Sequence, residues 1–526
     1  MARVLVTDPI AEDGLDVLRR GADVDVRLGL SPAELLSAVA GYQGLVVRSE
    51  TRVTAAVLDA GRDLEVVGRA GVGVDNIDVD AATRRGVAVV YAPEANTVSA
   101  AEHTIALMLS LARHIPEAHA SLREGSWDRS RFLGVELRGK TLGLLGLGRV
   151  GSEVARRARA LEMNVIAYDP GVGPDRFQML GVGIASFDQV LQESDFISLH
   201  AILPADSRHL LDEAQFKRMK PGVRLVNVAR GSLINEAALL EALERGTVAG
   251  AALDVFGEEP PAADSPLLRH ANVIVTPHLG ASTAEAQERV AADVAHQVLA
   301  ILRGEPAIYA VNLPMVTGET FKIIAPYLQA ASQAASLTTQ LSDGQFESVE
   351  IEYLGEIADF DLAPLKASVI KGLLAPISEE SVTLVNANLV AEQRGLRITE
   401  RKGHYEGIYK DLIRVHLTTS AGKTSVSATV AHDGPHIVEI NDFWVDVSPG
   451  QGTLLLCENV DRPGMIGRIG TFLGSKDINI SFMRVGREKV RGRALMVLGL
   501  DDTLDPQTLA EIARIPDIFS ARTARI

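Results

Sequence analysis

The chain of 526 residues is too long for one ordinary hydrophobic core, which predicts three or four domains. Its formal net charge of −16, without any run rich in lysine and arginine, argues against a nucleic-acid or anionic-membrane partner, so an anionic ligand would need a local cluster of arginines. The single cysteine excludes internal disulfides, no apolar run is long enough to span a membrane, and the first residues lack the pattern of a signal peptide, which together indicate a soluble cytoplasmic protein.

Two candidate anion-binding loops follow the first strands of the chain. Short buried strands alternate with helical patterns over residues 3–7, 14–20, 32–40, 45–48 and 64–68, which predicts a small α/β unit. The later two strands end beside Arg48 and Arg69, and Arg69 is followed by Gly71, Val72 and Gly73. Ligands bind at the carboxyl ends of parallel strands, so these loops are candidates, although solvated surface arginines are the alternative interpretation.

A basic, aromatic loop comes next. Residues 100–113 are apolar on nearly every face, which predicts a helix buried between domains or subunits, with Asn96 at its start. The loop at residues 127–134 contains Arg129 and Arg131 beside a tryptophan and a phenylalanine. Binding of an anion is one interpretation of this loop, and a charged, solvated loop is the other.

The clearest motif of the chain has the order strand, glycine turn, helix, strand, acid. In its G-x-G-x-x-G segment, Gly146 permits a tight turn, Gly148 lets the backbone approach a pyrophosphate, and Gly151 allows close packing of the helix on the strand. The helix N-terminus, with Arg149 and Val150 in its first turn, offers free N–H groups and a positive dipole end. We therefore expect these five residues to bind a dinucleotide.

Asp169 ends the strand that follows, where a ribose hydroxyl would need an acceptor. Its carboxylate would accept from the ribose 2′-OH of NAD but repel the 2′-phosphate of NADP, and no arginine follows it directly. NAD is therefore the expected cofactor, and no metal ion is expected. An ordinary glycine turn in an α/β protein is the alternative.

Three residues suited to chemistry follow successive strands further along the chain. These strands are expected over residues 195–200, 224–231, 250–256 and 272–278. Arg230, Glu259 and His278 then fall at one edge of a parallel sheet, toward which the nicotinamide end of the dinucleotide would point. Each has a structural alternative, namely a buried ion-pair partner, a surface acid and a core histidine.

The three side chains match the needs of alcohol oxidation. Hydride transfer from an alcohol leaves a proton, and histidine is the side chain best suited to accept it near neutral pH, so His278 is the predicted base. A carboxylate beside the ring, here Glu259, would fix its tautomer and favour its protonated form. Arg230 would grip a substrate carboxylate with its planar fork and polarise the adjacent carbonyl oxygen.

In these motifs the chain resembles the D-isomer-specific 2-hydroxyacid dehydrogenases. The resemblance rests on the glycine motif and on residues 227–231, 253–260 and 276–283, and it extends over essentially the whole chain. It implies that Arg230, Glu259 and His278 are catalytic. It further implies that Asp254 meets the nicotinamide carboxamide and that Ala229 also lies at the cofactor.

The resemblance also implies a substrate site, whose lining residues are Gly71, Val72, Gly73 and Asn96. A phosphate on the substrate would be held by arginines from the N-terminal unit and from the loop before the glycine motif. Arg48 and Arg131 are the first candidates, and Arg69 and Arg129 are the next.

The implied fold is α/β, with a Rossmann-type NAD-binding domain inserted in a flavodoxin-like substrate domain. An α+β intervening domain and a ferredoxin-like ACT domain follow. The expected boundaries are 1–97 with 281–314 for the substrate domain, 98–280 for the NAD-binding domain, 315–450 for the intervening domain and 451–526 for the ACT domain. A long amphipathic helix expected at 284–302 supports the inference that the chain returns here to complete the substrate domain.

The last segment predicts a regulatory module. Alternating stretches at 412–418 and 424–430 predict an antiparallel sheet, and the order strand, helix, strand, strand, helix, strand after residue 453 is ferredoxin-like. The resemblance to ACT domains implies an amino-acid effector, L-serine, bound near Asn459, Asp461 and Asn479 where two domains pair. A role in assembly alone is the alternative.

Within the family, the match is closest to members that oxidise 3-phospho-D-glycerate to 3-phosphohydroxypyruvate with NAD, the first step of the phosphorylated pathway to L-serine. A homo-oligomer, dimer or tetramer, is expected. One alternative is a glyoxylate or hydroxypyruvate reductase, which has no need of an ACT domain. The other is a non-catalytic dinucleotide-sensing protein, which has no need of all three catalytic side chains.

Overall fold

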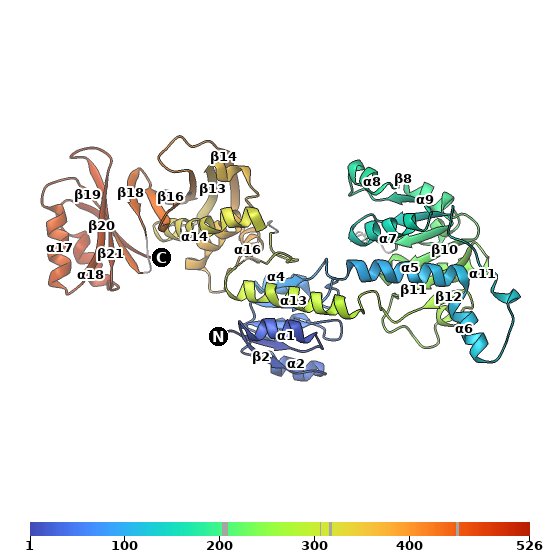
Figure 1. Ribbon diagram of the computed structural model, residues 1–526. Helices are drawn as coiled ribbons and strands as arrows, with labels where there is room; N and C mark the ends of the chain where they lie inside the picture. Colours follow the sequence, from blue (N-terminus) through green and yellow to red (C-terminus); the bar gives the residue numbers. More distant parts are fainter. Residues whose placement is uncertain (202–208, 306, 315–317, 449–451) are drawn as a thin grey trace.

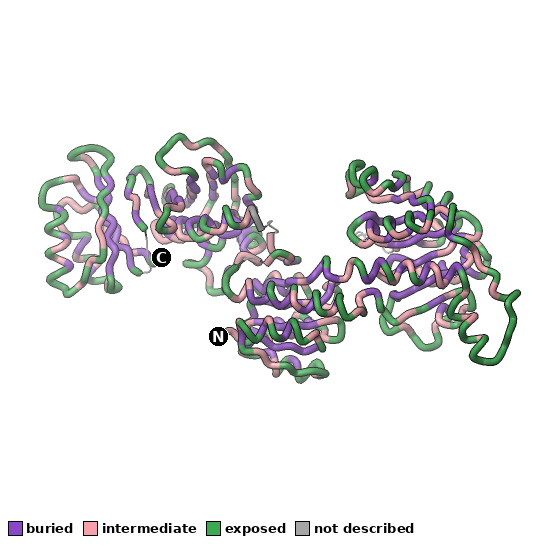
Figure 2. Tube along the Cα trace, viewed as in Figure 1, coloured by how far each residue is buried: buried purple, intermediate pink, exposed green. Residues whose placement is uncertain are grey.

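The computed structural model describes residues 1–201, 209–305, 307–314, 318–448 and 452–526. Within these ranges the chain forms four β-sheets with helices packed on them (Figure 1). Buried residues follow the strands and the helix faces that cover them (Figure 2). The predicted domain boundaries at residues 315 and 450–451 fall on residues outside the described ranges.

The first sheet is parallel and has the order β2-β1-β3-β4-β5. Its strands are β1 (Arg3–Val6), β2 (Asp23–Val26), β3 (Gly44–Val47), β4 (Val66–Arg69) and β5 (Ala88–Tyr91). Its helices are α1 (Glu12–Arg19), α2 (Pro32–Ala38), α3 (Ala55–Ala60) and α4 (Val79–Arg84). This strand order is that of flavodoxin-like folds, in which ligands bind at the carboxyl ends of the strands.

A helix from much later in the sequence completes this unit. Helix α13 (Ala284–Leu302) lies over α1 (Figure 1), and a Cβ on Gly14 would stand only 2.6 Å from that of Ala291. Beyond α13, Asn312 accepts from the amide of Val89 at 2.9 Å and donates to the carbonyl of Val87 at 2.9 Å, both in or beside β5. The start of α13 is thereby brought next to the loops that follow β3 and β4.

The second sheet is also parallel, in the order β12-β11-β10-β9-β6-β7-β8. Its strands are β6 (Thr141–Leu145), β7 (Asn164–Tyr168), β8 (Gly183–Ile184), β9 (Phe196–Leu199), β10 (Val223–Asn227), β11 (Val248–Leu253) and β12 (Val273–Val275). Its helices are α5 (Thr97–Arg113), α6 (Ile115–Arg123), α7 (Arg149–Ala160), α8 (Pro174–Leu180), α9 (Phe187–Glu193), α10 (Glu213–Phe216), α11 (Glu236–Glu244) and α12 (Pro266–Arg269). The strand order reverses between β6 and β9, which is the switch point where dinucleotides bind in doubly wound sheets.

The third sheet has the order β14-β13-β15-β16-β17-β18. Its strands are β13 (Phe346–Gly355), β14 (Arg397–Gly403), β15 (Asp411–Thr419), β16 (Gly422–Ala431), β17 (Gly434–Ile440) and β18 (Phe443–Val447), and its helices are α14 (Gly318–Gln340), α15 (Ala363–Leu374) and α16 (Ala387–Gln393). The predicted antiparallel pairing of β15 with β16 is present, whereas β14 joins the edge in parallel, which the alternating pattern did not indicate.

The fourth sheet is antiparallel, in the order β20-β21-β19-β22. Its elements are β19 (Thr453–Val460), α17 (Met465–Ser475), β20 (Ile480–Arg487), β21 (Arg493–Leu500), α18 (Pro506–Ala513) and β22 (Ile518–Arg525). One face carries both helices, and the other shares a core with the third sheet through Leu456, Val497 and Val445. The predicted fold class, including the ferredoxin-like element order, is confirmed. No helix in the described part of the chain is long and apolar enough to cross a bilayer.

A close helix contact in the third unit allows a stability prediction. Gly372 of α15 faces α14, and a Cβ there would collide with the carbonyl oxygen of Ser332. We expect Gly372→Ala to lower the free energy of unfolding by about 1–3 kcal/mol through overpacking. The exposed neighbour on the same helix, Lys371→Ala, should change it by less than about 0.5 kcal/mol.

Urea unfolding followed by the fluorescence of Trp444 in β18 measures both variants, with the other tryptophan, Trp127, replaced by phenylalanine. Equal midpoints for Gly372→Ala and Lys371→Ala would show that α14 and α15 do not pack this closely.

Candidate functional site

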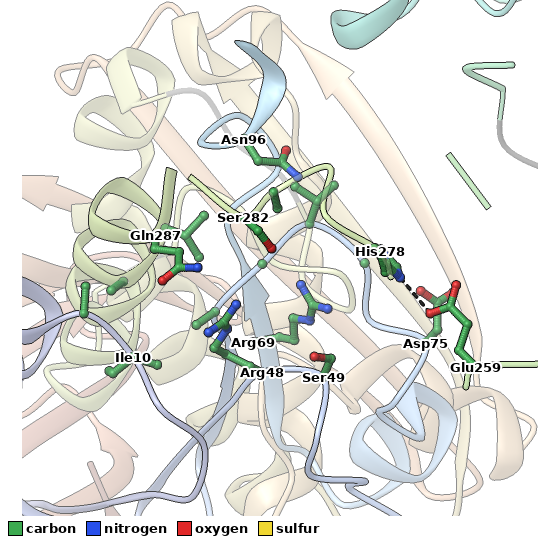
Figure 3. A pocket seen from close by; sticks show the side chains of 18 of the residues that line it. Ile10, Arg48, Ser49, Arg69, Asp75, Asn96, Glu259, His278, Ser282 and Gln287 are labelled. Atoms are coloured by element: carbon green, nitrogen blue, oxygen red, sulfur yellow. Dashed lines mark hydrogen bonds and ion pairs between the residues drawn. The ribbon is translucent and has the colours of Figure 1, made fainter. Parts of the chain in front are cut away.

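A cavity of about 310 Å³ lies between the first and second sheets (Figure 3). One wall is formed by the residues that follow β3 and β4 and by the first turns of α13. The other is formed by the loops after β10, β11 and β12. The carboxyl ends of two parallel sheets thus face the same space, which is where such sheets bind ligands.

The structure brings the three predicted catalytic residues together in this cavity. His278 Nδ1 lies 2.7 Å from Glu259 Oε2, and Glu259 Oε1 accepts from the backbone amide of Phe256 at 3.1 Å. Arg230 lines the same cavity, with its Nε 3.3 Å from Asp75 Oδ2. Figure 3 shows the His278 ring pointing toward Glu259. The arrangement pairs an imidazole with a carboxylate and places a guanidinium beside them.

Two further arginines line the opposite wall. Arg48 and Arg69 point into the cavity beside Ser49 (Figure 3). Burial, and then the positive charges of Arg230 and Arg48, lower the pKa of Arg69 to about 10, so it remains a cation at neutral pH. Within the described ranges its Nε has no hydrogen-bond partner. A buried cation among other cations favours an anionic ligand.

The predicted glycine loop and Asn96 also border this cavity. Gly71, Val72 and Gly73 run along its wall, and Asn96 stands just before α5. A Cβ on Gly71 would collide with the Arg69 guanidinium, so glycine is required there to let that side chain fold back over the loop. The loop therefore shapes the positive end of the cavity.

Arg131 is not brought to the cavity of its own chain. It lies in the short 3-10 helix η1 (Ser130–Phe132), with its guanidinium 5.6 Å from the Phe132 ring centroid. The arm around it is exposed, and Trp127 and Leu133 are 76% and 87% exposed. Four polar residues that line the cavity were not among the predicted site residues, namely Ser49, Asp75, Ser282 and Gln287. The last two belong to the returning segment, whose contact with the cavity arises only from the tertiary fold.

The glycine motif forms the predicted cradle between β6 and α7. Gly146 has φ +104°, and a Cβ there would stand 2.5 Å from the carbonyl oxygen of His200. A Cβ on Gly151 would collide with the carbonyl oxygen of Gly146, whereas one on Gly148 would meet nothing within 4 Å. The backbone is therefore open to a ligand at Gly148, directly at the N-terminus of α7, as a pyrophosphate requires.

The other predicted cofactor residues surround this cradle. Arg149 and Val150 begin α7, and Arg149 Nε lies 3.2 Å from Glu94 Oε1. Asp169 accepts from the amide of Leu147 at 2.7 Å and stands at the end of β7, as expected for a ribose acceptor. The described residues thus fit a dinucleotide.

Asp254 and Ala229, the remaining predicted cofactor residues, follow the neighbouring strands β11 and β10. Asp254 is fully buried beneath the loop that carries His278, and its carboxylate accepts from the amides of Leu279 and Gly280 at 2.7 and 2.8 Å. Ala229 follows β10 in a turn closed by its amide, which donates to Asn227 at 3.1 Å. The Asp254 carboxylate therefore holds the loop that carries His278.

The three predicted effector residues are divided between two ends of the fourth sheet. Asn459 is 2% exposed, with its Oδ1 unpartnered within the described ranges, and Asp461 follows it and accepts from the amide of Arg491 at 2.9 Å. Asn479 precedes β20 and donates to Asp501 at 2.6 Å. The strand register places Asn479 level with the start of β19, whereas Asn459 lies near the end of β19. Asn459, Asp461 and Asn479 of one chain therefore do not form a single site.

Family comparisons agree with this architecture. Three family models match: the NAD binding domain of the D-isomer specific 2-hydroxyacid dehydrogenases over residues 105–280, the D-3-phosphoglycerate dehydrogenase intervening domain over 323–441, and the ACT domain over 453–517. Among solved structures, the TT0316 protein of Thermus thermophilus is 39% identical with a TM-score of 0.55, over 59% of this chain and 99% of its own. A glyoxylate reductase from a Paecilomyces species is 32% identical with a TM-score of 0.54, over 59% and 98%.

Curated relatives match along the full length. D-3-phosphoglycerate dehydrogenase 2, chloroplastic, of Arabidopsis thaliana is 46% identical over 98% of this chain and 85% of its own. The D-3-phosphoglycerate dehydrogenase of Bacillus subtilis is 44% identical over 99% of both chains. That of Synechocystis is 42% identical over 100% and 95%. The resemblance inferred from the motifs is confirmed: this chain belongs to the D-3-phosphoglycerate dehydrogenase family, with an NAD-binding domain and an ACT domain.

Proposed function

We propose that this chain catalyses the NAD-dependent oxidation of 3-phospho-D-glycerate to 3-phosphohydroxypyruvate, the first step of the phosphorylated pathway to L-serine. The observation that carries the proposal is the His278–Glu259 pair, which faces Arg230 in a cavity whose far wall holds Arg48 and Arg69. An acid–base pair, a carboxylate grip and a phosphate grip are the three functions that this substrate requires.

The geometry assigns the proton to one ring nitrogen. Because His278 Nδ1 is held by the Glu259 carboxylate at 2.7 Å, it carries the hydrogen and leaves Nε2 as the free base. Nε2 takes the proton of the substrate C2 hydroxyl, and the positive charge that forms on the ring is stabilised by Glu259. Gly146, Gly148 and Gly151 would hold NAD, which would supply the acceptor for the hydride from C2.

Arg230 binds the substrate carboxylate in this scheme. Its guanidinium is paired with Asp75 at 3.3 Å, and the Arg230 and Asp75 side chains are 40% and 77% exposed, so the ion pair is weak and exchangeable. A substrate carboxylate can displace Asp75 and orient C2 toward His278.

Arg48 and Arg69 bind the phosphate at the other wall. Because the whole chain carries a charge of −16, such a local positive cluster is needed to hold a trianion. Ser49, beside them, supplies a hydroxyl donor to the phosphate oxygens.

A homo-oligomer, a dimer or tetramer, is part of the proposal. The support is the segment from the end of α6 to Leu133, which contains Arg131 and leaves the apolar side chains of Leu122, Trp127 and Leu133 exposed. Apolar groups gathered on an exposed arm are typical of a subunit contact. Such a contact would carry Arg131 to the cavity of a second subunit.

The domain division follows the same scheme. We propose residues 1–97 with 281–314 for substrate binding, 98–280 for NAD, 315–450 for the intervening domain and 451–526 for the ACT domain. A cytoplasmic location is proposed as well, and its support is the single cysteine, Cys457, buried and unpaired.

The test of the function is NADH production from matched substrates. We expect a much higher kcat/KM with 3-phospho-D-glycerate than with D-glycerate, because the two differ only in the group that Arg48 and Arg69 would bind. A preference for D-glycerate or glyoxylate-type substrates would instead identify another dehydrogenase of the family.

His278→Ala should lower kcat by about 10² to 10⁴, since loss of a general base typically has that effect. The Kd for NADH should remain nearly unchanged, because the ring handles the proton and not the dinucleotide. Glu259→Gln should alter the pH dependence of kcat. His432→Ala, an exposed histidine in the third unit, is the control. Turnover within a few-fold of normal in His278→Ala would refute the assignment.

Arg48→Ala and Arg69→Ala should raise KM for 3-phospho-D-glycerate while sparing D-glycerate. Arg52→Ala, close in sequence but outside the cavity lining, should affect neither. Arg131→Ala should raise KM as Arg48→Ala does only if a second subunit brings Arg131 to the cavity. The KM of this variant is therefore to be measured together with the native mass of the protein, which gives its oligomeric state. Equal effects on both substrates would show that these arginines do not read the phosphate.

We further propose that L-serine binds the ACT domain and inhibits. Its support is the Asn459 side chain beside Asp461, because the buried Oδ1 of Asn459 has no hydrogen-bond partner among the described residues. Two paired domains would bring Asn479 of a second copy near them. Such a shared site would depend on how the copies are arranged, as allostery requires.

Calorimetry with L-serine on the full-length chain should give binding heat that Asp461→Ala abolishes and that the exposed Asp502→Ala retains. Neither heat nor inhibition at millimolar serine would leave the domain a role in assembly alone.

A further inference from the structure

A polar cluster centred on the buried Asp254 has no part in the reaction scheme above. It joins three elements: His103 of α5, Asp254 after β11 and Thr276 after β12. His103 Nε2 lies 3.1 Å from Asp254 Oδ1 and 3.2 Å from Thr276 Oγ1, and the Thr276 hydroxyl donates to Asp254 Oδ1 at 2.6 Å. The cluster therefore links the helix at the side of the sheet to the loop that carries the proposed base.

Asp254 is the centre of this cluster. Its side chain has no exposed surface, and its oxygens accept from the amides of Leu279 and Gly280. The amide of His278 itself donates to the Asp254 carbonyl oxygen at 2.9 Å. Three consecutive N–H groups of the loop are thus held by one residue.

The loop needs this hold because its backbone is strained. His278 has φ +54°, in the left-handed region that non-glycine residues rarely occupy and that persists only where the surroundings enforce it. Gly280, two residues on, fits tightly, since a Cβ there would stand 2.9 Å from a methyl group of Val228. Movement of the Asp254 carboxylate would therefore release the loop and turn the imidazole away from Glu259.

The hydrogen on His103 can be assigned. Burial by itself would raise the pKa of Asp254, but hydrogen bonds from His103, Thr276 and Leu279 hold it below its ordinary value, so the carboxylate is ionised and only accepts. The Thr276 hydroxyl hydrogen is already directed at Asp254. His103 must therefore carry a hydrogen on Nε2 and donate it to the carboxylate.

We propose that His103 is a positioning residue for the dehydrogenase reaction. By donating Nε2–H to Asp254 it fixes the carboxylate that holds residues 278–280, and so it keeps the His278 ring aligned with Glu259 and the substrate. The inference rests on the proposed role of His278. Because His103 is not among the residues that line the cavity, it acts on His278 through the loop.

Two substitutions separate the hydrogen bond from the bulk of the side chain. Glutamine can present an N–H donor at a similar reach, whereas leucine fills the space without one. We expect His103→Leu to lower kcat about 10- to 100-fold, as misplacement of a catalytic group by about 1 Å can do, and His103→Gln to stay within about threefold. The Kd for NADH, measured by fluorescence titration, should change less than about threefold in both.

A double-mutant cycle shows whether the effect passes through His278. If it does, His103→Leu should cost much less activity in a His278→Ala background than in the native chain, because the aligned ring is already absent. The pH profile of kcat should also shift in His103→Leu and not in His103→Gln. Should His103→Leu fail to fold, Thr276→Val removes another donor to the same carboxylate and is expected to lower kcat with the Kd for NADH retained.

The outcomes are separable from those of the proposed function. An unchanged kcat in His103→Leu, an equal loss in both backgrounds, or a failure of His103→Gln to restore turnover would each overturn the positioning role. A normal kcat in His278→Ala alone would instead overturn the proposed base, whatever His103 does.

Discussion

The hydrogen bond between His278 and Glu259 is the interaction on which the rest of the site depends. Only while Nδ1 is held at 2.7 Å does Nε2 remain a free base directed into the cavity. The two residues come from different loops, after β12 and after β11, so their contact requires two adjacent parallel strands to end at the same level. The α/β fold supplies that edge, and the buried Asp254 carboxylate holds one of the two loops in place.

Charge distribution decides what this site can accept. A chain with a net charge of −16 repels anions over most of its surface, yet the cavity gathers Arg48, Arg69 and Arg230. Two of them come from the first sheet and its loops, and the third comes from the second sheet. A substrate with an anionic group at each end would therefore bridge both halves of the cavity.

Most residues of this site could be predicted from the sequence, because local motifs and the parallel topology determine where these residues lie. A glycine turn after a strand predicts the cradle, and residues after successive parallel strands meet at one edge, which is why Arg230, Glu259 and His278 could be grouped. The residues that could not be predicted are placed by contacts between distant parts of the chain. Gln287 lines the cavity only because α13 returns, Asn479 lies away from Asn459 because of antiparallel register, and Arg131 sits on an exposed arm whose partner no single chain specifies.

In the proposed reaction, a hydride leaves C2 of 3-phospho-D-glycerate while His278 takes the hydroxyl proton. Substrate carrying deuterium at C2 tests this directly when NADH formed in a single turnover is analysed by mass spectrometry. We expect NADH that carries one deuterium, formed with a primary isotope effect on the chemical step. NADH without the label, or no NADH from this substrate, would contradict it.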